Sequence, residues 1–201
     1  MITIIDYKVV NLGSVLNMIR KIGGHEIKVV EKPEDLAGAT KIILPGVGSY
    51  DRAVMNLEKM ELFNPIKELA LNGTPLLGIC LGMQLLGKGS EEGRCSGLGL
   101  INAYSRRLPD QNVKVPHMGW SNLAIKRPTA LLNGLSEDSR YYFVHSYHVV
   151  CENESNVIAT AKHGIEFAAV INSGNIWGAQ FHPEKSHRFG MEMLKSFLEK
   201  M

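Results

Sequence analysis

The sequence predicts an α/β fold: an open, mostly parallel sheet flanked by helices, with an antiparallel or mixed extension. In the first half, short apolar segments alternate with stretches of helical periodicity, a pattern typical of parallel strands joined by crossover helices. The second half carries short segments rich in β-branched and aromatic residues, separated by turn signals. The 201 residues show no repeat, low-complexity stretch or linker. Residues 1–201 are therefore expected to form a single domain.

The first half is expected to contain four strands, at Ile2–Asp6, Glu26–Val30, Lys41–Leu44 and Pro75–Ile79. Apolar residues with helical spacing predict helices over Asn11–Ile22 and Tyr50–Leu71. The second of these helices is expected to break near Asn64-Pro65, because proline interrupts a helix. A further helix is expected to begin near Leu81-Gly82, directly after the fourth strand.

The second half is expected to add strands to the same sheet. They are predicted at Val113–Val115, Leu123–Ile125, Tyr141–Val150, Val157–Lys162, Phe167–Asn172 and Ile176–Phe181. A last helix is predicted from about Arg188 to Lys200, because Met191, Leu194 and Leu198 fall on one face.

Composition excludes several function classes. The net charge is +2, so no basic field indicates a nucleic-acid partner. No window reaches the ~18 apolar residues that a membrane helix needs, and the start looks like a strand rather than a signal peptide. The three cysteines, Cys80, Cys95 and Cys151, lack CxxC spacing. We therefore expect no metal site, no cofactor and no disulfide framework, and a cytoplasmic location.

One cysteine has a distinctive surrounding. Cys80 lies in a Gly-x-Cys-x-Gly turn between a predicted strand and a predicted helix, which parallels the nucleophile elbow of hydrolases. Free amides and the helix dipole at that position favour a thiolate. The N–H of Leu81 is then expected to face a developing oxyanion. The alternative is a buried structural cysteine.

A second signal lies about a hundred residues later, in a His-Pro-Glu run. Residues two apart in an extended segment share a side, so Glu184 can orient the imidazole of His182. Both Cys80 and His182 follow predicted strands, whose carboxyl ends form the ligand-binding edge of an open α/β sheet. These three residues are the predicted catalytic triad. Taken alone, the His-Pro-Glu run is more typical of a solvated turn that ends a strand.

A third signal is Pro-Gly-Val-Gly, which follows a strand at the same edge. Glycines at 46 and 48 allow the peptide to flip, so the N–H of Val47 is predicted as a second oxyanion donor. The alternative is an ordinary strand-to-helix turn.

With these motifs the chain resembles the class-I (triad) glutamine amidotransferases, which are flavodoxin-like in fold. Within that family it is similar to the glutaminase subunits of imidazole glycerol phosphate synthases, from histidine biosynthesis. The resemblance spans nearly the whole chain. It is carried by Asp6-Tyr7 with Asn11-Leu12, Leu44–Gly48, Leu76–Leu86 with Ser90-Glu91-Glu92, Pro116–Trp120, Tyr142–Tyr147 and Gln180–Ser186.

The resemblance implies a glutaminase that makes glutamate and ammonia and passes the ammonia to a (β/α)₈-barrel cyclase subunit in a heterodimer. It further implies roles for particular residues. Gln84 and Glu92 would contact the amino and carboxylate ends of glutamine. Backbone at Ser146, Tyr147 and Gly46–Gly48 would line the same pocket. Partner-facing residues would be Asn11, Met118, Trp120 and Lys185.

Two departures from the family pattern bear on the partner. Lys8-Val9-Val10 stands where the family has a glycine-bearing segment, and Ser121 stands where it has asparagine. A paralogous glutaminase that feeds a sugar-precursor amidating synthase is therefore an alternative. A cysteine hydrolase or peptidase of similar fold and a flavodoxin-like binding module are others. The binding module has little support, because no dinucleotide glycine fingerprint follows the first strand.

Overall fold

The computed structural model describes residues 1–9, 12–111, 113–134, 136 and 138–201. Within them the main sheet has eight strands in the order β2-β1-β3-β4-β13-β12-β11-β8. The first five run parallel: β2 (Ile27–Val30), β1 (Ile2–Ile5), β3 (Lys41–Gly46), β4 (Leu76–Cys80) and β13 (Ile176–Ala179). The other three are antiparallel: β12 (Ile165–Ser173), β11 (Val157–His163) and β8 (Ala124–Ile125). The predicted fold class is confirmed.

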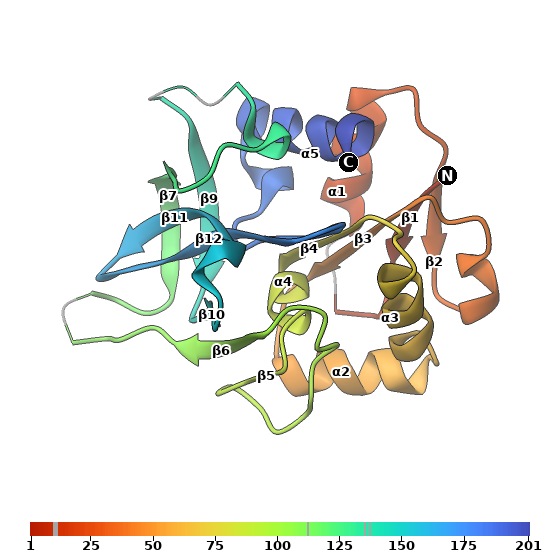
Figure 1. Cartoon of the computed structure of the whole chain (residues 1–201), viewed down its shortest axis with the longest axis horizontal. Coiled ribbons are helices and arrows are strands. Elements are labelled where there is room, and N and C mark those ends of the chain that lie inside the picture. Colours follow the sequence, from red (N-terminus) through yellow and green to blue (C-terminus); the bar gives the residue numbers. More distant parts are fainter. Residues whose placement is uncertain (10–11, 112, 135, 137) are drawn as a thin grey trace.

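Helices cover both faces of this sheet (Figure 1). One face packs against α1 (Leu12–Ile22) and α5 (His187–Lys200), which contribute to one apolar cluster. The other face packs against α2 (Tyr50–Lys59), α3 (Phe63–Leu71) and the short α4 (Leu81–Leu85), which contribute to a second cluster. No helix of the described residues combines the length and apolar character needed to cross a membrane.

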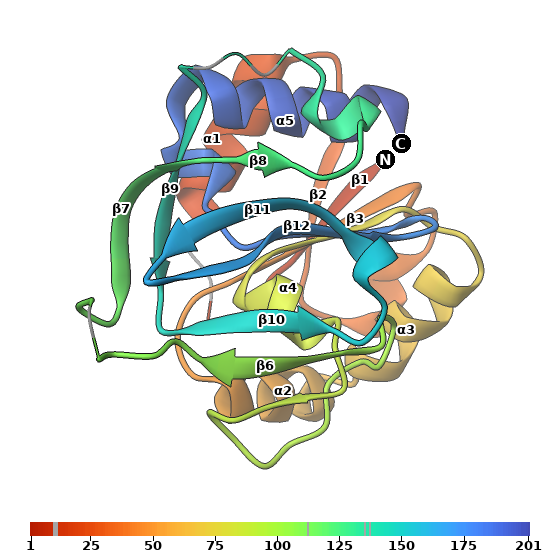
Figure 2. The same cartoon turned by 60° about the vertical axis from the view of Figure 1, so that its left-hand side comes forward.

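Two small sheets stand beside the main one (Figure 2). One has the order β10-β6-β5, formed by β10 (Tyr147–Cys151), β6 (Ala103–Arg107) and β5 (Gly89–Ser90). The other pairs β7 (His117–Asn122) with β9 (Arg140–His145). Short 3-10 turns occur at Pro33–Leu36, Ala130–Leu132, Glu154–Asn156 and Pro183–Lys185.

Several predicted elements differ from the structure. The strand predicted at Val113–Val115 is wrong: the strand here is β7, four residues later, and β5 and β6 were not predicted. The segment Tyr141–Val150 is two strands, because the chain leaves β9 for the other small sheet at Ser146. The long helix breaks between Lys59 and Phe63, near the predicted position. Pro65 lies in the first turn of α3, where its missing N–H costs no hydrogen bond.

Candidate active site

Cys80 lies on a strained turn at the end of β4. Its backbone has φ 54° and ψ −108°, a conformation that residues with a Cβ rarely adopt. Gly78 and Gly82 make the turn possible: a Cβ on Gly82 would collide with the carbonyl oxygen of Leu44, and one on Gly78 with the backbone of Gly82. Such strain is found where surrounding structure enforces it, often at active sites. The helix that follows Cys80 has only five residues, so its dipole is weaker than expected.

His182 reaches the same edge of the sheet from the neighbouring strand. β13 pairs with β4 in parallel, so the segments that follow the two strands emerge side by side. The Nδ1 atom of His182 lies 2.7 Å from Oε1 of Glu184, and both side chains are buried. The carboxylate accepts a hydrogen bond from Nδ1–H, and Nε2 is then the nitrogen available for proton exchange. Within the described residues Nε2 has no hydrogen-bond partner, and the sulfur of Cys80 lies 3.8 Å from the carbonyl oxygen of Val144.

The protonation of His182 reflects this arrangement. Burial disfavours the imidazolium, whereas Cys80 and Glu184 both favour it, and together they raise the pKa of His182 from 6.5 to about 10. The contacts with Glu184 and Cys80 thus favour the imidazolium. It can give its proton to a leaving group.

A cavity of about 310 Å³ opens next to the thiol. That volume lies at the lower end of the range for small-molecule sites. Its lining consists of Val47, Gly48, Cys80, Leu81, Gln84, Glu92, Pro116, Val144, His145, Ser146 and Tyr147. Of the residues predicted for the pocket, only Gly46 is not in this lining; it pairs with Cys80 in the sheet. His182 and Glu184 also lie outside the lining.

Gln84 is tied to the pocket wall. Its Nε2 donates to the carbonyl oxygen of Tyr147 at 3.0 Å and lies 3.5 Å from Oε1 of Gln180. Gln180 in turn directs its Nε2 to the sulfur of Cys80 at 3.7 Å. Sequence reasoning missed Gln180. The available signal was its place two residues before His182, on the same side of an extended segment.

Glu92 presents a half-buried carboxylate to the cavity. The N–H of Tyr50 donates to its Oε2 at 3.1 Å, and its own N–H donates to the Ser90 hydroxyl oxygen at 3.1 Å. Burial raises the pKa of Glu92. These contacts hold the carboxylate at the wall of the cavity.

The predicted oxyanion donor of Val47 is engaged elsewhere. Its N–H donates to the carbonyl oxygen of Val9 at 2.9 Å. Gly48, with φ 105°, and Gly46 flank this peptide. An oxyanion role for Val47 therefore requires this hydrogen bond to break and the peptide to turn. The donor role stays a prediction.

The departure at Lys8 has a local explanation. Lys8 has φ 68°, a conformation that glycine adopts without strain. Asp6 accepts the Lys8 N–H at 2.9 Å, and the Lys8 ammonium lies 2.7 Å from a carboxylate oxygen of Glu31. Val10 and the predicted interface residue Asn11 lie outside the described residues.

The other three predicted interface residues lie on the surface. Met118 is 63% exposed and Trp120 44%, which excludes a core position for the tryptophan. The Trp120 ring stacks on His187 with centroids 5.4 Å apart and meets the edge of Tyr142 at 5.7 Å. The ammonium of Lys185 lies 5.7 Å from the same tyrosine ring. We call Met118, Trp120, Tyr142 and Lys185 the aromatic face.

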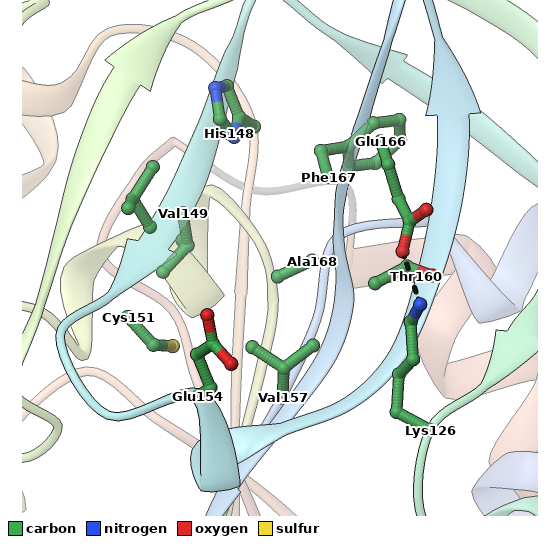
Figure 3. A pocket seen from close by; sticks show the side chains of 11 residues that line it. Lys126, His148, Val149, Cys151, Glu154, Val157, Thr160, Glu166, Phe167 and Ala168 are labelled. Carbon is green, nitrogen blue, oxygen red and sulfur yellow. Dashed lines mark ion pairs between the residues drawn. The ribbon is translucent and has the colours of Figure 1, made fainter.

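A larger cavity, of about 430 Å³, lies between β10 and the strands β11 and β12 (Figure 3). Figure 3 shows Glu154 and the Lys126–Glu166 ion pair on its rim, with Val157 and Ala168 between them. Cys151 lines this cavity, and burial raises the pKa of its thiol to about 11. A thiol whose raised pKa disfavours the thiolate makes this cavity a weaker candidate for the active site than the one at Cys80.

Comparison with known proteins agrees with this geometry. The sequence model of the family "Glutamine amidotransferase class-I" matches residues 3–201. The chain is 48% identical to imidazole glycerol phosphate synthase subunit HisH 2 of Methanococcus maripaludis, covering 99% of both chains. It is 42% identical to the subunit HisH 2 of Pseudomonas aeruginosa, again over 99% of both.

Solved structures with this fold are more distant in sequence. The chain superposes on the structure of PurLQS from Thermotoga maritima with a TM-score of 0.77 at 22% identity, covering 98% of this chain and 96% of that one. A glutamine amidotransferase from Thermotoga maritima gives 0.67 at 19% identity, covering 98% and 81%. These matches show the shared fold.

Proposed function

The chain belongs to the class-I glutamine amidotransferase family, and from this premise we propose that it hydrolyses glutamine at Cys80 and supplies the ammonia to a synthase subunit. The observation that carries the proposal is the meeting of three features at one sheet edge. Cys80 occupies a strained turn, His182 follows the adjacent parallel strand, and Glu184 holds the imidazole at 2.7 Å.

In the first half of the reaction, the Cys80 thiolate attacks the side-chain amide carbon of glutamine. A sulfur–carbon bond forms, and the carbonyl electrons move to oxygen. The His182 imidazolium then protonates the amide nitrogen, the carbon–nitrogen bond breaks, and ammonia leaves. A glutamyl thioester stays on Cys80.

In the second half, water replaces the sulfur. Neutral His182 takes a proton from the attacking water, and the tetrahedral intermediate collapses to glutamate and a free thiolate. Glu184 stabilises the imidazolium in both halves. The Leu81 N–H lies next in the chain to the thiol and is the proposed oxyanion donor; such a donor typically lowers the barrier by ~3 kcal/mol.

The names of the chain's relatives support the proposed destination of the ammonia. Those at 42–48% identity bear the name of an imidazole glycerol phosphate synthase subunit. We assign this chain the glutaminase role in that synthase and in histidine biosynthesis. The partner would be a (β/α)₈-barrel cyclase, joined in a heterodimer in the cytoplasm.

The aromatic face is the proposed docking site of that partner. Lys185 directly follows the triad residue Glu184, so this face adjoins the site where ammonia is made. Two large exposed apolar side chains, Met118 and Trp120, suit a protein interface. A short protected route matters because free ammonia becomes ammonium in neutral water and then no longer acts as a nucleophile.

The sugar-precursor alternative concerns the partner and leaves the glutaminase chemistry unchanged. It is suggested by the departures from the family pattern at Lys8 and Ser121. Affinity purification of the full chain from its host distinguishes the two. A cyclase in the purified complex supports the histidine assignment, and an amidating synthase for sugar precursors contradicts it.

Replacement of Cys80 by alanine tests the chemistry itself. The variant should keep the fold and lose glutamate release. A diazoketone analogue of glutamine should label the wild-type chain at Cys80, with Cys95 and Cys151 unlabelled. Turnover of Cys80→Ala near the wild-type rate, or labelling at another cysteine, would reject the assignment.

A further inference from the structure

Tyr7 carries a hydroxyl that takes no part in the chemistry proposed so far. The residue follows β1 and is fully buried. Within the described residues its oxygen has no hydrogen-bond partner. A buried tyrosine hydroxyl normally has one, because leaving it unpaired costs the full loss of hydration. The orphaned hydroxyl therefore needs an explanation.

The position of the hydroxyl supplies one. It lies directly over the backbone of Gly46, so that a Cβ on Gly46 would collide with it. Gly46 pairs with Cys80 in the sheet and begins the peptide that ends in the Val47 N–H. The hydroxyl is thus packed against the one peptide unit that must turn to present an oxyanion donor.

The present orientation of that peptide satisfies the Val47 N–H but not Tyr7. The N–H donates to Val9, on the segment that leaves β1. When the peptide turns, the N–H leaves Val9 and the carbonyl of Gly46 changes direction next to the Tyr7 hydroxyl. The turned carbonyl then needs a donor, and Tyr7 is the buried donor beside it.

We infer that Tyr7 is a positioning residue, whose hydroxyl donates to the Gly46 carbonyl in the turned state and so stabilises the orientation in which Val47 faces the oxyanion. The inference rests on the proposed function and adds one specific contact to it. Burial, and to a smaller extent the nearby Cys80, raises the pKa of Tyr7 far above its usual range. The hydroxyl therefore keeps the proton that it would donate.

The test is Tyr7→Phe in the full chain, compared with wild type for glutamate release. Loss of one neutral hydrogen bond in the turned state should lower kcat about three- to tenfold, with KM unchanged. Alkylation of Cys80 by iodoacetamide forms no oxyanion, so its rate should stay within about twofold. The melting temperature should not fall, because the resting fold loses only an unsatisfied hydroxyl.

Thr3→Val is the matched control. Thr3 lies on β1, is equally buried, and also has an unpartnered hydroxyl in the described chain, but it lies four residues before Tyr7. Its replacement should leave kcat unchanged. An unchanged kcat in Tyr7→Phe would overturn the inference, as would a fall in kcat accompanied by lower melting temperature and altered alkylation. Absence of glutamate release from the wild-type chain in the presence of its synthase partner would instead reject the proposed function.

Discussion

The N–H of Val47 donates a 2.9 Å hydrogen bond to the carbonyl oxygen of Val9. One of the two proposed oxyanion donors is therefore engaged, while Glu184 already contacts the imidazole of His182. Since an oxyanion donor is typically worth about 10²- to 10³-fold in kcat, we expect the isolated chain to hydrolyse glutamine slowly. Addition of the synthase partner with its ligand should raise the rate by about that factor.

Amide hydrogen exchange at Val47 gives a direct readout. The amide should be protected in the isolated chain and exchange faster once the partner has activated it, because its acceptor has been lost. The Leu44 amide, within β3, serves as a control that should not change. Equal glutaminase rates with and without the partner would contradict a resting state held by Val9.

Glu184→Gln should separate the charge of the triad carboxylate from its shape. The side-chain oxygen of glutamine can still accept a hydrogen bond from Nδ1–H of His182, but a neutral amide cannot stabilise the imidazolium by charge. Glu184 is one of the groups that raise the pKa of His182 to about 10. The variant should therefore lower kcat about ten- to hundredfold and move the alkaline limb of its pH profile to lower pH. An alkaline limb at the wild-type position would show that Glu184 does not raise the pKa of His182.

The free energy of unfolding should be largest near pH 6.5 to 7, because folding lowers the pKa of two histidines and raises that of a third. His117 and His145 form a buried pair with nitrogens 3.3 Å apart, and the Ser121 hydroxyl lies 3.1 Å from the other nitrogen of His117. Burial is the main cause that lowers the pKa of His117 to about 4 and of His145 to about 3. Both are thus neutral in the folded state.

The signs of the two effects differ. Unfolding returns His117 and His145 to about pKa 6.5, so the unfolded chain takes up protons below that pH and stability falls as pH falls toward 4. Each histidine contributes a slope of about 1.4 kcal/mol per pH unit to the free energy of unfolding. His182 has the opposite shift: its stabilisation is complete below about pH 6.5 and is lost as pH rises toward 10.

Urea unfolding at pH 5 to 9 measures both limbs. On the acid side, His117→Gln should reduce the slope of the free energy of unfolding against pH by the contribution of one histidine, because glutamine does not titrate. The alkaline limb should be unchanged. The carboxylates that titrate below pH 5 are common to both proteins. An acid slope that is the same in the variant would mean that His117 is already charged in the fold.

The turn at Cys80 could be predicted from sequence because its determinants are local. A Gly-x-Cys-x-Gly turn needs glycines two residues from Cys80, and the structure shows the backbone clashes that a Cβ would cause there. The parallel strands could be predicted for a similar reason: buried strands read as continuous apolar runs.

What could not be predicted depends on distant pairing. The strand β7 pairs with β9 across the chain, and its sequence, His-Met-Gly-Trp-Ser-Asn, has little β-branched character. Gln180 reaches Cys80 only because β13 lies next to β4. The engagement of Val47 by Val9 is likewise a contact between two loops, which no local pattern encodes.

The last prediction concerns the aromatic face. Trp120 stacks on His187 while leaving 44% of its surface exposed, so it is held in place but not buried. A tryptophan ordered in this way loses little further entropy when a partner covers it, which is the usual character of an interface hot spot. Trp120→Ala should therefore weaken partner binding at least about thirtyfold, corresponding to ~2 kcal/mol.

Tyr104→Ala is the matched control for that prediction. Tyr104 is a similarly exposed aromatic residue, 41% exposed, but it lies on β6 in the other small sheet. Titration calorimetry with the cyclase should show near wild-type affinity for this variant, because its side chain lies off the aromatic face. If both variants bind equally well, the partner docks elsewhere. If Tyr104→Ala alone weakens binding, the interface is on the β6 side, and the ammonia route past Lys185 would have to be abandoned.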